Sequence, residues 1–309
     1  MKKRSVLKKT TIVMLLVCVS LLVDAGQLLA KTSQAKSNMM TTKSAKVSLV
    51  SSQQGKQYPN YQRKKAQIAI IIDDIGNKRA DSDAFSLPKK VTFSILPHTP
   101  FSTQFSTYSH HQGREVMLHM PMESLHGEVL GEGGLLASMY PEEVEKKLLL
   151  ALESVPHATG VNNHMGSKLT QITLQMNAVM QVLNNNNLYF IDSRTTKFTK
   201  AHIIAQQHGV ASAQRNVFLD HYASEAFLEK QFEQLILKAR RNGSVIGIAH
   251  PYKVSISFLQ RKLANLPDDI ELVSVSEYLS FEGKDGIYDF EPPRIAKETS
   301  RPITDTAPE

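Results

Sequence analysis

The sequence predicts an α/β fold in which a parallel sheet closes, or nearly closes, into a (β/α) barrel. Residues 68–72 are apolar and mostly β-branched, which is typical of a strand buried on both faces. Further β-rich runs follow, and several are separated by segments with helical periodicity. Residues 66–280 are numerous enough to form one large core, so a single domain is expected. An open doubly wound sheet is the alternative.

The expected strands and helices can be placed in order along this region. After the first strand, further strands are expected at residues 91–96, 115–119, 159–163, 188–192, 209–213, 245–249 and 271–275. The clearest helix begins at Pro141, a favoured first-turn residue, and carries acidic side chains near the positive end of its dipole. Two more helices are expected at residues 173–183 and 225–241. The last of these has Ser224 as its N-cap and stops before Asn242-Gly243.

The first 65 residues differ in composition from the rest. Residues 1–30 have a basic start, an apolar core and then small residues, which predicts an export signal and a periplasmic or cell-envelope location. An uncleaved anchor is the alternative. Residues 31–65 are expected to form a basic flexible tether, and residues 281–309 a disordered tail. The single cysteine, Cys18, lies in the signal, so the mature chain would have no disulfide and no thiolate ligand.

The net charge of +7 does not indicate a nucleic-acid partner. Residues 1–65 hold 13 Lys or Arg and one acid, leaving 23 Lys or Arg against 28 Asp or Glu from residue 66 onward. The predicted folded part is therefore acidic, and no nucleic-acid binding is expected. Contact with a membrane is expected only through the signal, if it is retained.

Side chains suited to catalysis follow most of the predicted strands. The carboxyl ends of parallel strands face one rim of a barrel, so these side chains are expected to lie near one another. They are Asp73, Asp74, His98, His119, His164, Asp192, Arg194 and His250.

Three of these residues predict a metal site. One carboxylate and two imidazoles, from Asp74, His119 and His164, suit a divalent ion with open positions, and Zn²⁺ is the expected ion. Asp73 is then placed to act as general base, provided that the chain turns after residue 72, because adjacent strand residues point to opposite faces. His250 would approach from the opposite side as general acid.

Three further polar residues are candidates to orient a substrate. They are Asp192, Arg194 and Arg215. Ordinary structural ion pairs are the alternative role for both arginines.

Several segments together resemble the divergent polysaccharide deacetylase family over about residues 66–280. They are residues 71–76 (Ile-Ile-Asp-Asp-Ile-Gly), 119–123 (His-Met-Pro-Met-Glu), 160–167 (Gly-Val-Asn-Asn-His-Met-Gly-Ser), 190–193, 215–220 and 248–251. The resemblance implies a distorted (β/α)7-type barrel and a substrate that is an N- or O-acetylated glycan. It also implies that Asp73 is the base, Asp74 a metal ligand and His250 the acid.

The sequence departs from the wider polysaccharide deacetylase superfamily at one position. That superfamily has two histidines four residues apart, whereas here His119 is followed four residues later by Glu123. Either Glu123 replaces the second imidazole or His164 enters from the next strand, and His164 is preferred. The leading hypothesis is an exported metal-dependent hydrolase that removes acetyl groups from a cell-envelope polysaccharide. The alternatives are an inactive glycan-binding or scaffold protein and a metal-dependent hydrolase of another bond.

Overall fold

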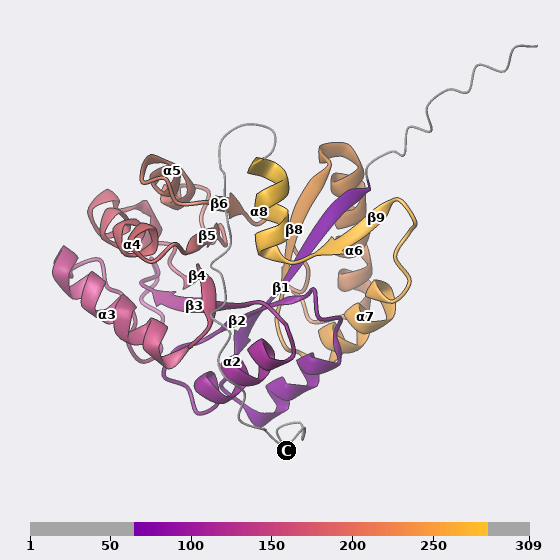
Figure 1. Ribbon diagram of the computed structural model, residues 1–309, viewed down its shortest axis with the longest axis horizontal. Coiled ribbons are helices and arrows are strands. Elements are labelled where there is room, and N and C mark those ends of the chain that lie inside the picture. Colours follow the sequence, from indigo (N-terminus) through magenta and orange to yellow (C-terminus); the bar gives the residue numbers. More distant parts are fainter. Residues whose placement is uncertain (1–64, 284–309) are drawn as a thin grey trace, which may run out of the picture. The chain divides into compact units, whose positions relative to one another are not determined.

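A computed structural model describes residues 65–283, in which strands and helices alternate (Figure 1). The predicted signal, the tether up to residue 64 and the tail from residue 284 lie outside the described residues. The strands are β1 (Ala66–Ile75), β2 (Thr92–Ile95), β3 (Val116–Met122), β4 (Ala158–Met165), β5 (Tyr189–Asp192), β6 (Ser212–Gln214), β7 (Val217–Phe218), β8 (Ser244–Ala249) and β9 (Ile270–Val273). The helices are η1 (Arg79–Ser86), α2 (Ser102–His111), α3 (Pro141–Ser154), η2 (Leu169–Gln171), α4 (Thr173–Asn185), α5 (Ala201–Gln207), α6 (Glu225–Asn242), α7 (Lys253–Leu263) and α8 (Val275–Gly283).

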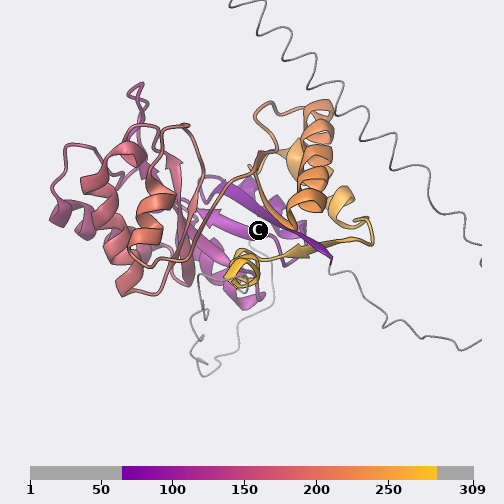
Figure 2. The same ribbon diagram turned by 90° about the horizontal axis from the view of Figure 1, so that it is seen from above.

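The strands form one parallel sheet that curls into a half-barrel (Figures 1 and 2). Its strand order is β6-β5-β4-β3-β2-β1-β8-β7, and β9 pairs with the start of β1. The edge strands β6 and β7 are joined by only two residues. The Arg215 N–H donates to the carbonyl of Asp192 on β5, and the Asn216 N–H donates to the carbonyl of Ile246 on β8. The prediction of an α/β barrel-like single domain is confirmed.

Strand β1 is buried on both faces, as its composition predicts. Ile68, Ile70 and Ile72 belong to the large core between the sheet and the surrounding helices, whereas Ala69 and Ile71 belong to a smaller cluster on the concave face of the sheet. Each fully buried Ile stabilises the fold by about 1.5–3 kcal/mol. The smaller cluster also contains Val275, Tyr278 and Leu279 of α8, so this helix fills the concave side of the half-barrel.

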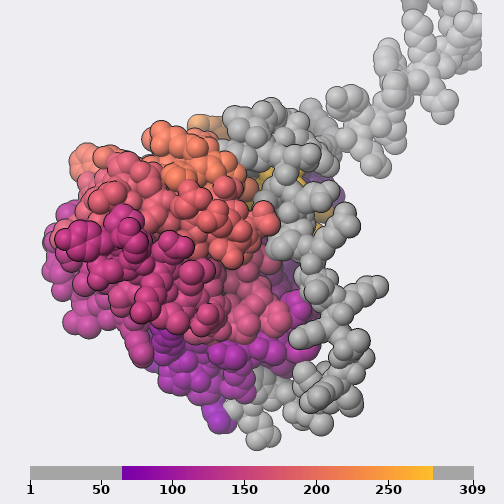
Figure 3. All heavy atoms as spheres, turned by 60° about the vertical axis from the view of Figure 1, so that its left-hand side comes forward, coloured from indigo at the N-terminus to yellow at the C-terminus, as the bar shows by residue number. Residues whose placement is uncertain are grey.

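The helices follow the expected signals closely. Helix α3 has its proline in the first turn, and its apolar side packs Val144 and Leu148 into the core. Helix α6 begins after Ser224, whose hydroxyl accepts from the N–H of Phe227, and ends at Gly243 with φ 86°. In the space-filling view, the middle part of the chain forms one continuous face (Figure 3). No helix within residues 65–283 is long and apolar enough to cross a bilayer.

Two details of the elements differ from the expectation. Strand β7 has only two residues, too few to show a period in the sequence, and was not predicted. Helix α8 continues to Gly283, so the predicted tail begins with the end of a helix.

Candidate metal centre and catalytic site

The alternation of side chains along the strands selects which residues reach the centre of the barrel. Ile71, Met117 and Ile248 belong to the cluster on the concave face. The residues two positions further on are Asp73, His119 and His250, which therefore point to the same side. The candidate site thus lies directly beyond the concave cluster, at the carboxyl ends of the strands.

Asp74 joins this site because β1 is irregular at its end. The pairing between β1 and β2 shifts register between Ile72 and Ile75, and Asp74 has φ 60°, in the left-handed region. Non-glycine residues seldom adopt this conformation, and where they do it often marks a functional site. Gly76 continues the turn with φ 116°. The turn that was needed to bring both carboxylates together is therefore present.

Asp74, His119 and His164 present three ligand atoms to one point. Asp74 Oδ1 lies 3.1 Å from His119 Nε2 and 2.9 Å from His164 Nδ1, and the two nitrogens are 3.1 Å apart. Asp74 Oδ1 is buried and has no hydrogen bond of acceptable geometry within residues 65–283. An ion at about 2.1 Å from each of three ligands places them roughly 3 Å apart when its bond angles are near 90°. The residues present therefore fit a divalent metal.

Asn162 fixes the tautomer of His119. Its amide nitrogen donates to Asp73 Oδ1 at 2.8 Å, so its oxygen faces His119 Nδ1 at 2.6 Å and also accepts from the Ser94 hydroxyl. An amide oxygen only accepts, so Nδ1 of His119 must carry the hydrogen. In a neutral imidazole this leaves a lone pair on Nε2, the nitrogen that faces Asp74 and His164.

The structure distinguishes between the two candidates for the third ligand. His164 lies at the centre, whereas Glu123 is engaged elsewhere. Glu123 pairs with Lys168 and accepts the N–H of Ala137 at 2.6 Å. The bond from Lys168 lowers the pKa of the Glu123 carboxyl. Glu123 does not belong to the group of converging ligand atoms, and His164 is the residue that completes it.

His250 belongs to a second hydrogen-bonded chain. Its Nδ1 lies 2.9 Å from Asp220 Oδ1, and its Nε2 lies 3.8 Å from Asp74 Oδ2. Asp220 is buried, and its other oxygen accepts from the His250 backbone N–H and the Ser255 hydroxyl, each at 2.7 Å. Asp220 therefore holds the ring so that Nε2 faces the centre.

Burial and charge shift the protonation of these groups in opposite directions. For Asp74, burial favours the neutral acid, but the contacts and charges of His119 and His164 prevail and hold the pKa of Asp74 well below its usual value. For His119, burial favours the neutral ring, but the charges of Asp73 and Asp74 raise its pKa to about 9. The pKa of His250 is raised against the effect of burial, mainly by Asp220. Without a metal ion, a proton on His119 therefore offsets part of the negative charge of the neighbouring carboxylates.

Asp192, one of the predicted substrate-binding residues, is fully buried and faces away from the centre. Phe190, two residues earlier, packs in the large core between sheet and helices, so alternation sends Asp192 to that side. Its carboxylate accepts from the Arg194 N–H at 2.8 Å and the Thr199 hydroxyl at 2.9 Å. Asp192 thus organises the loop after β5, and its burial leaves no carboxylate oxygen for a substrate.

The two predicted arginines lie at the rim beside this loop. Arg194 is exposed, and Arg215 is half-buried. They line one hollow together with Thr196, Lys197 and Asn216. Neither arginine is within ion-pair distance of a carboxylate of residues 65–283.

The supporting residues Asn162 and Asp220 had no role assigned from the sequence. A signal for Asn162 was present, because it precedes His164 by two positions and therefore shares its face of β4. Asp220 follows the short strand β7, which the sequence did not reveal.

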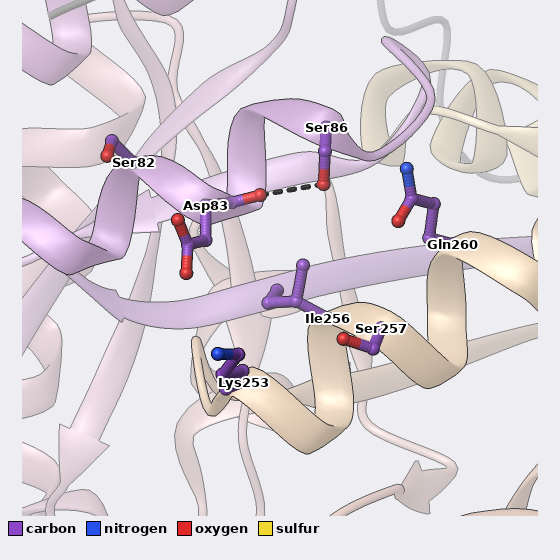
Figure 4. A pocket seen from close by; sticks show the side chains of 7 residues that line it. All are labelled: Ser82, Asp83, Ser86, Lys253, Ile256, Ser257 and Gln260. Atoms are coloured by element: carbon purple, nitrogen blue, oxygen red, sulfur yellow. Dashed lines mark hydrogen bonds between the residues drawn. The ribbon is translucent and has the colours of Figure 1, made fainter. Parts of the chain in front are cut away.

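A separate hollow lies between η1 and α7 (Figure 4). It is lined by Ser82, Asp83, Ser86, Lys253, Ile256, Ser257 and Gln260, and thus by none of the residues of the metal centre.

Known proteins resemble this chain over the described domain. Residues 70–279 match the family described as divergent polysaccharide deacetylase. The uncharacterized protein YibQ of Escherichia coli (strain K12) is 40% identical over 215 residues, which cover 69% of this chain and 67% of that protein. An uncharacterized protein of Haemophilus influenzae is 36% identical over 219 residues, which cover 71% of this chain and 78% of that protein.

One solved structure supports the fold. The uncharacterized protein ATU2773 from Agrobacterium tumefaciens C58 superposes with a TM-score of 0.66 and 24% identity. The match covers 71% of this chain and 91% of that chain.

Proposed function

The chain belongs to the divergent polysaccharide deacetylase family, and from this membership and the geometry of the centre we propose that it is a metal-dependent hydrolase. The reaction is removal of acetyl groups from a polysaccharide. The observation that carries the proposal is the convergence of Asp74 Oδ1, His119 Nε2 and His164 Nδ1, each within 3.1 Å of the other two. Two imidazoles and one carboxylate are a donor set that suits Zn²⁺.

A divalent ion held by these three residues would polarise the acyl carbonyl and lower the pKa of a water molecule. Asp73 would take a proton from the attacking water. It is buried beside the triad, and Asn162 holds its Oδ1 in place at 2.8 Å. The different partners of the neighbouring carboxylates support different roles, one as base and one as ligand.

His250 would supply the proton that the leaving group needs. When water attacks the acetyl carbon, the bond from that carbon to the sugar nitrogen or oxygen breaks, and the departing atom takes the proton of His250 Nε2. The products are acetate and a free amino or hydroxyl group on the sugar. Asp220 favours the protonated imidazole that this step requires, since it contacts Nδ1 at 2.9 Å.

The location of the reaction is part of the proposal. The basic start and apolar core of residues 1–30 support export, and an exported deacetylase would meet the glycans of the cell envelope. Detection of the processed chain in the periplasmic fraction of a fractionated cell supports this location. Finding the chain only in the cytoplasm contradicts it.

The decisive experiment combines metal analysis with a product assay on the full chain. The purified protein is expected to contain one divalent ion per chain and to release acetate from an acetylated oligosaccharide. Asp73→Asn should keep the ion and lose acetate release, whereas Asp74→Ala should lose both. Absence of a divalent ion from the intact protein, or glycan binding without acetate release, contradicts the proposal and favours a binding or scaffold role.

A further inference from the structure

Three cations surround one hollow on the rim of the barrel. Arg194, Lys197 and Arg215 line it with Thr196 and Asn216, and its volume is about 270 Å³. No acidic side chain is among its lining residues, although the chain from residue 66 onward has more acids than bases. Within residues 65–283, none of the three cations is close enough to a carboxylate to form an ion pair. The hollow is therefore lined by positive charge with no carboxylate in direct contact, although the charges of Asp73 and Asp192 act on Arg215 from farther away.

The loop that carries Arg194 and Lys197 is held by hydrogen bonds to buried side chains. Asp192 accepts from the Arg194 N–H and from the Thr199 hydroxyl, so it bridges the two ends of the loop. The Ser193 N–H donates to Asn163 Oδ1 at 2.9 Å. Arg194 itself is held at φ 50°, an unfavourable conformation for a side chain of its size. The backbone that carries these cations is thus held in a defined conformation.

Arg215 is oriented by its surroundings. Its Nε donates to the Ser193 carbonyl at 2.7 Å, one terminal nitrogen donates to the Arg194 carbonyl at 3.1 Å, and its guanidinium carbon lies 4.9 Å from the centre of the Phe218 ring. A guanidinium has five N–H donors, so donors remain for a ligand. Its planar fork matches a carboxylate or a phosphate.

The hollow is close to the proposed catalytic acid. The ring of Phe218 lies 5.4 Å from the ring of His250, centre to centre. The guanidinium carbon of Arg215 is therefore no farther from the His250 ring than 4.9 Å plus 5.4 Å. A short oligosaccharide is long enough to span such a distance.

We propose that this hollow is a substrate subsite for an anionic group, and that the enzyme acts on acidic glycans. This inference rests on the proposed deacetylase function and specifies its substrate class. The anion is a carboxylate or a phosphate carried by the glycan near the acetylated position. Its recognition would come from Arg194, Lys197 and Arg215, and the phenyl ring of Phe218 would separate it from the reacting centre.

The test measures binding to the metal-loaded full chain with Asp73→Asn, which keeps the ligand from being consumed. Three acetylated oligosaccharides are compared by calorimetry: one with a carboxylate, its carboxyl-reduced neutral counterpart and one with a phosphate. At least one acidic ligand is expected to bind about 10-fold or more tightly than the neutral one. The tighter of the two identifies the anion.

Variants locate the effect. Arg194 and Lys197 are exposed, so Arg194→Gln with Lys197→Gln is expected to fold normally and to abolish the preference for the acidic ligand. Lys146→Gln, an exposed lysine on α3, is the matched control and should leave the preference unchanged. Equal affinity for acidic and neutral ligands, or a preference that survives the double substitution, overturns the proposal.

A separate acetate assay with unsubstituted Asp73 distinguishes failure of the subsite from failure of the proposed function. If the chain releases acetate equally well from acidic and neutral glycans, the subsite proposal is wrong and the hydrolase proposal stands. If the chain prefers acidic glycans in binding but releases no acetate, the subsite stands and the hydrolase proposal is wrong.

Discussion

His119 and His250 face the same centre, but their outer nitrogens contact different kinds of group. His119 Nδ1 donates to the neutral amide oxygen of Asn162, whereas His250 Nδ1 faces the carboxylate of Asp220. An amide acceptor fixes the tautomer without adding a charge, so a metal ion that replaces the second proton of His119 meets the lone pair of Nε2. A carboxylate favours the imidazolium, so it keeps a proton on Nε2. The same side chain is thus suited to be a ligand on one side of the barrel and an acid on the other.

The largest expected effect on acetate release comes from substituting His119, the histidine proposed as a metal ligand. His119→Ala should lose the metal and lower the rate of acetate release by about 10³-fold or more, because metal assistance supplies several kcal/mol and each 1.4 kcal/mol is about tenfold. Metal content by mass spectrometry and acetate release would be measured together. His126→Ala, at an exposed loop residue, is the control. A His119 variant with full metal content would show that the ligand assignment is wrong.

Substituting His250, the histidine proposed as general acid, should leave the metal bound. His250→Ala is expected to retain the ion and to slow acetate release by about 10²–10⁴-fold, the usual contribution of general acid catalysis. Asp220→Asn should move the basic limb of the pH–rate profile to lower pH, since Asp220 is the main group that raises the pKa of His250. Loss of metal from His250→Ala would place His250 among the ligands and contradict the assignment.

Replacing the amide of Asn162 with a carboxylate would test whether a neutral hydrogen-bond partner of His119 is needed for metal binding. Asn162→Asp puts a carboxylate beside both His119 and Asp73, so it favours the imidazolium of His119 and repels Asp73. Metal affinity is expected to fall by about 10–100-fold, the usual effect of changing the partner of a ligating histidine. Competition with a chelator of known affinity gives the measurement. An unchanged affinity would mean that Asn162 does not set the protonation of His119.

The pH dependence of stability should separate the metal-free and metal-loaded forms. The folded-state pKa of His119 is about 9, above the ordinary value of 6.5. Protonated His119 therefore stabilises the metal-free fold fully below pH 6.5, and this stabilisation is lost as the pH rises to about 9. Denaturant unfolding of the metal-free protein should show a falling free energy over this range. The metal-loaded protein should not show this fall, because the ion takes the place of the proton.

The smallest effect is expected at Glu123. Glu123→Gln removes its pair with partly exposed Lys168, so the free energy of unfolding should fall by no more than about 1 kcal/mol. Metal content and acetate release should remain unchanged. A loss of metal would return Glu123 to the ligand set and displace His164.

Much of this arrangement could be predicted because parallel strands direct their carboxyl ends to one rim. Asp74, His119 and His164 follow the ends of three strands, and the structure brings their side chains together; that they bind a metal stays a prediction. The hydrogen-bond partners were harder to predict because they depend on side-chain direction. Asp192 was expected at the centre, but it is an even number of residues from Phe190 and so faces the outer core. Counting alternation from the buried residues would have excluded it.

Other features could not be predicted because the structural elements are too short or too irregular to produce a pattern in the sequence. Strand β7 has two residues, yet it leads directly to Asp220, which orients His250. The positive φ of Asp74 accompanies a local shift in pairing with the neighbouring strand. In the local sequence, only Gly76 indicates that the chain turns there. Such features arise from tertiary packing and not from local preference.

The pairing of β1 with β9 has a consequence for how the domain folds. Ala66 pairs with Ile270, and the interior cluster around Ile71 also needs Val275, Tyr278 and Leu279. The contacts of the first strand therefore become complete only after the last residues of the domain have folded against it. Contacts between such distant parts of a chain slow folding, and during synthesis the concave face stays uncovered until α8 has emerged. The domain should thus reach its folded state only after almost all of its residues have been synthesised.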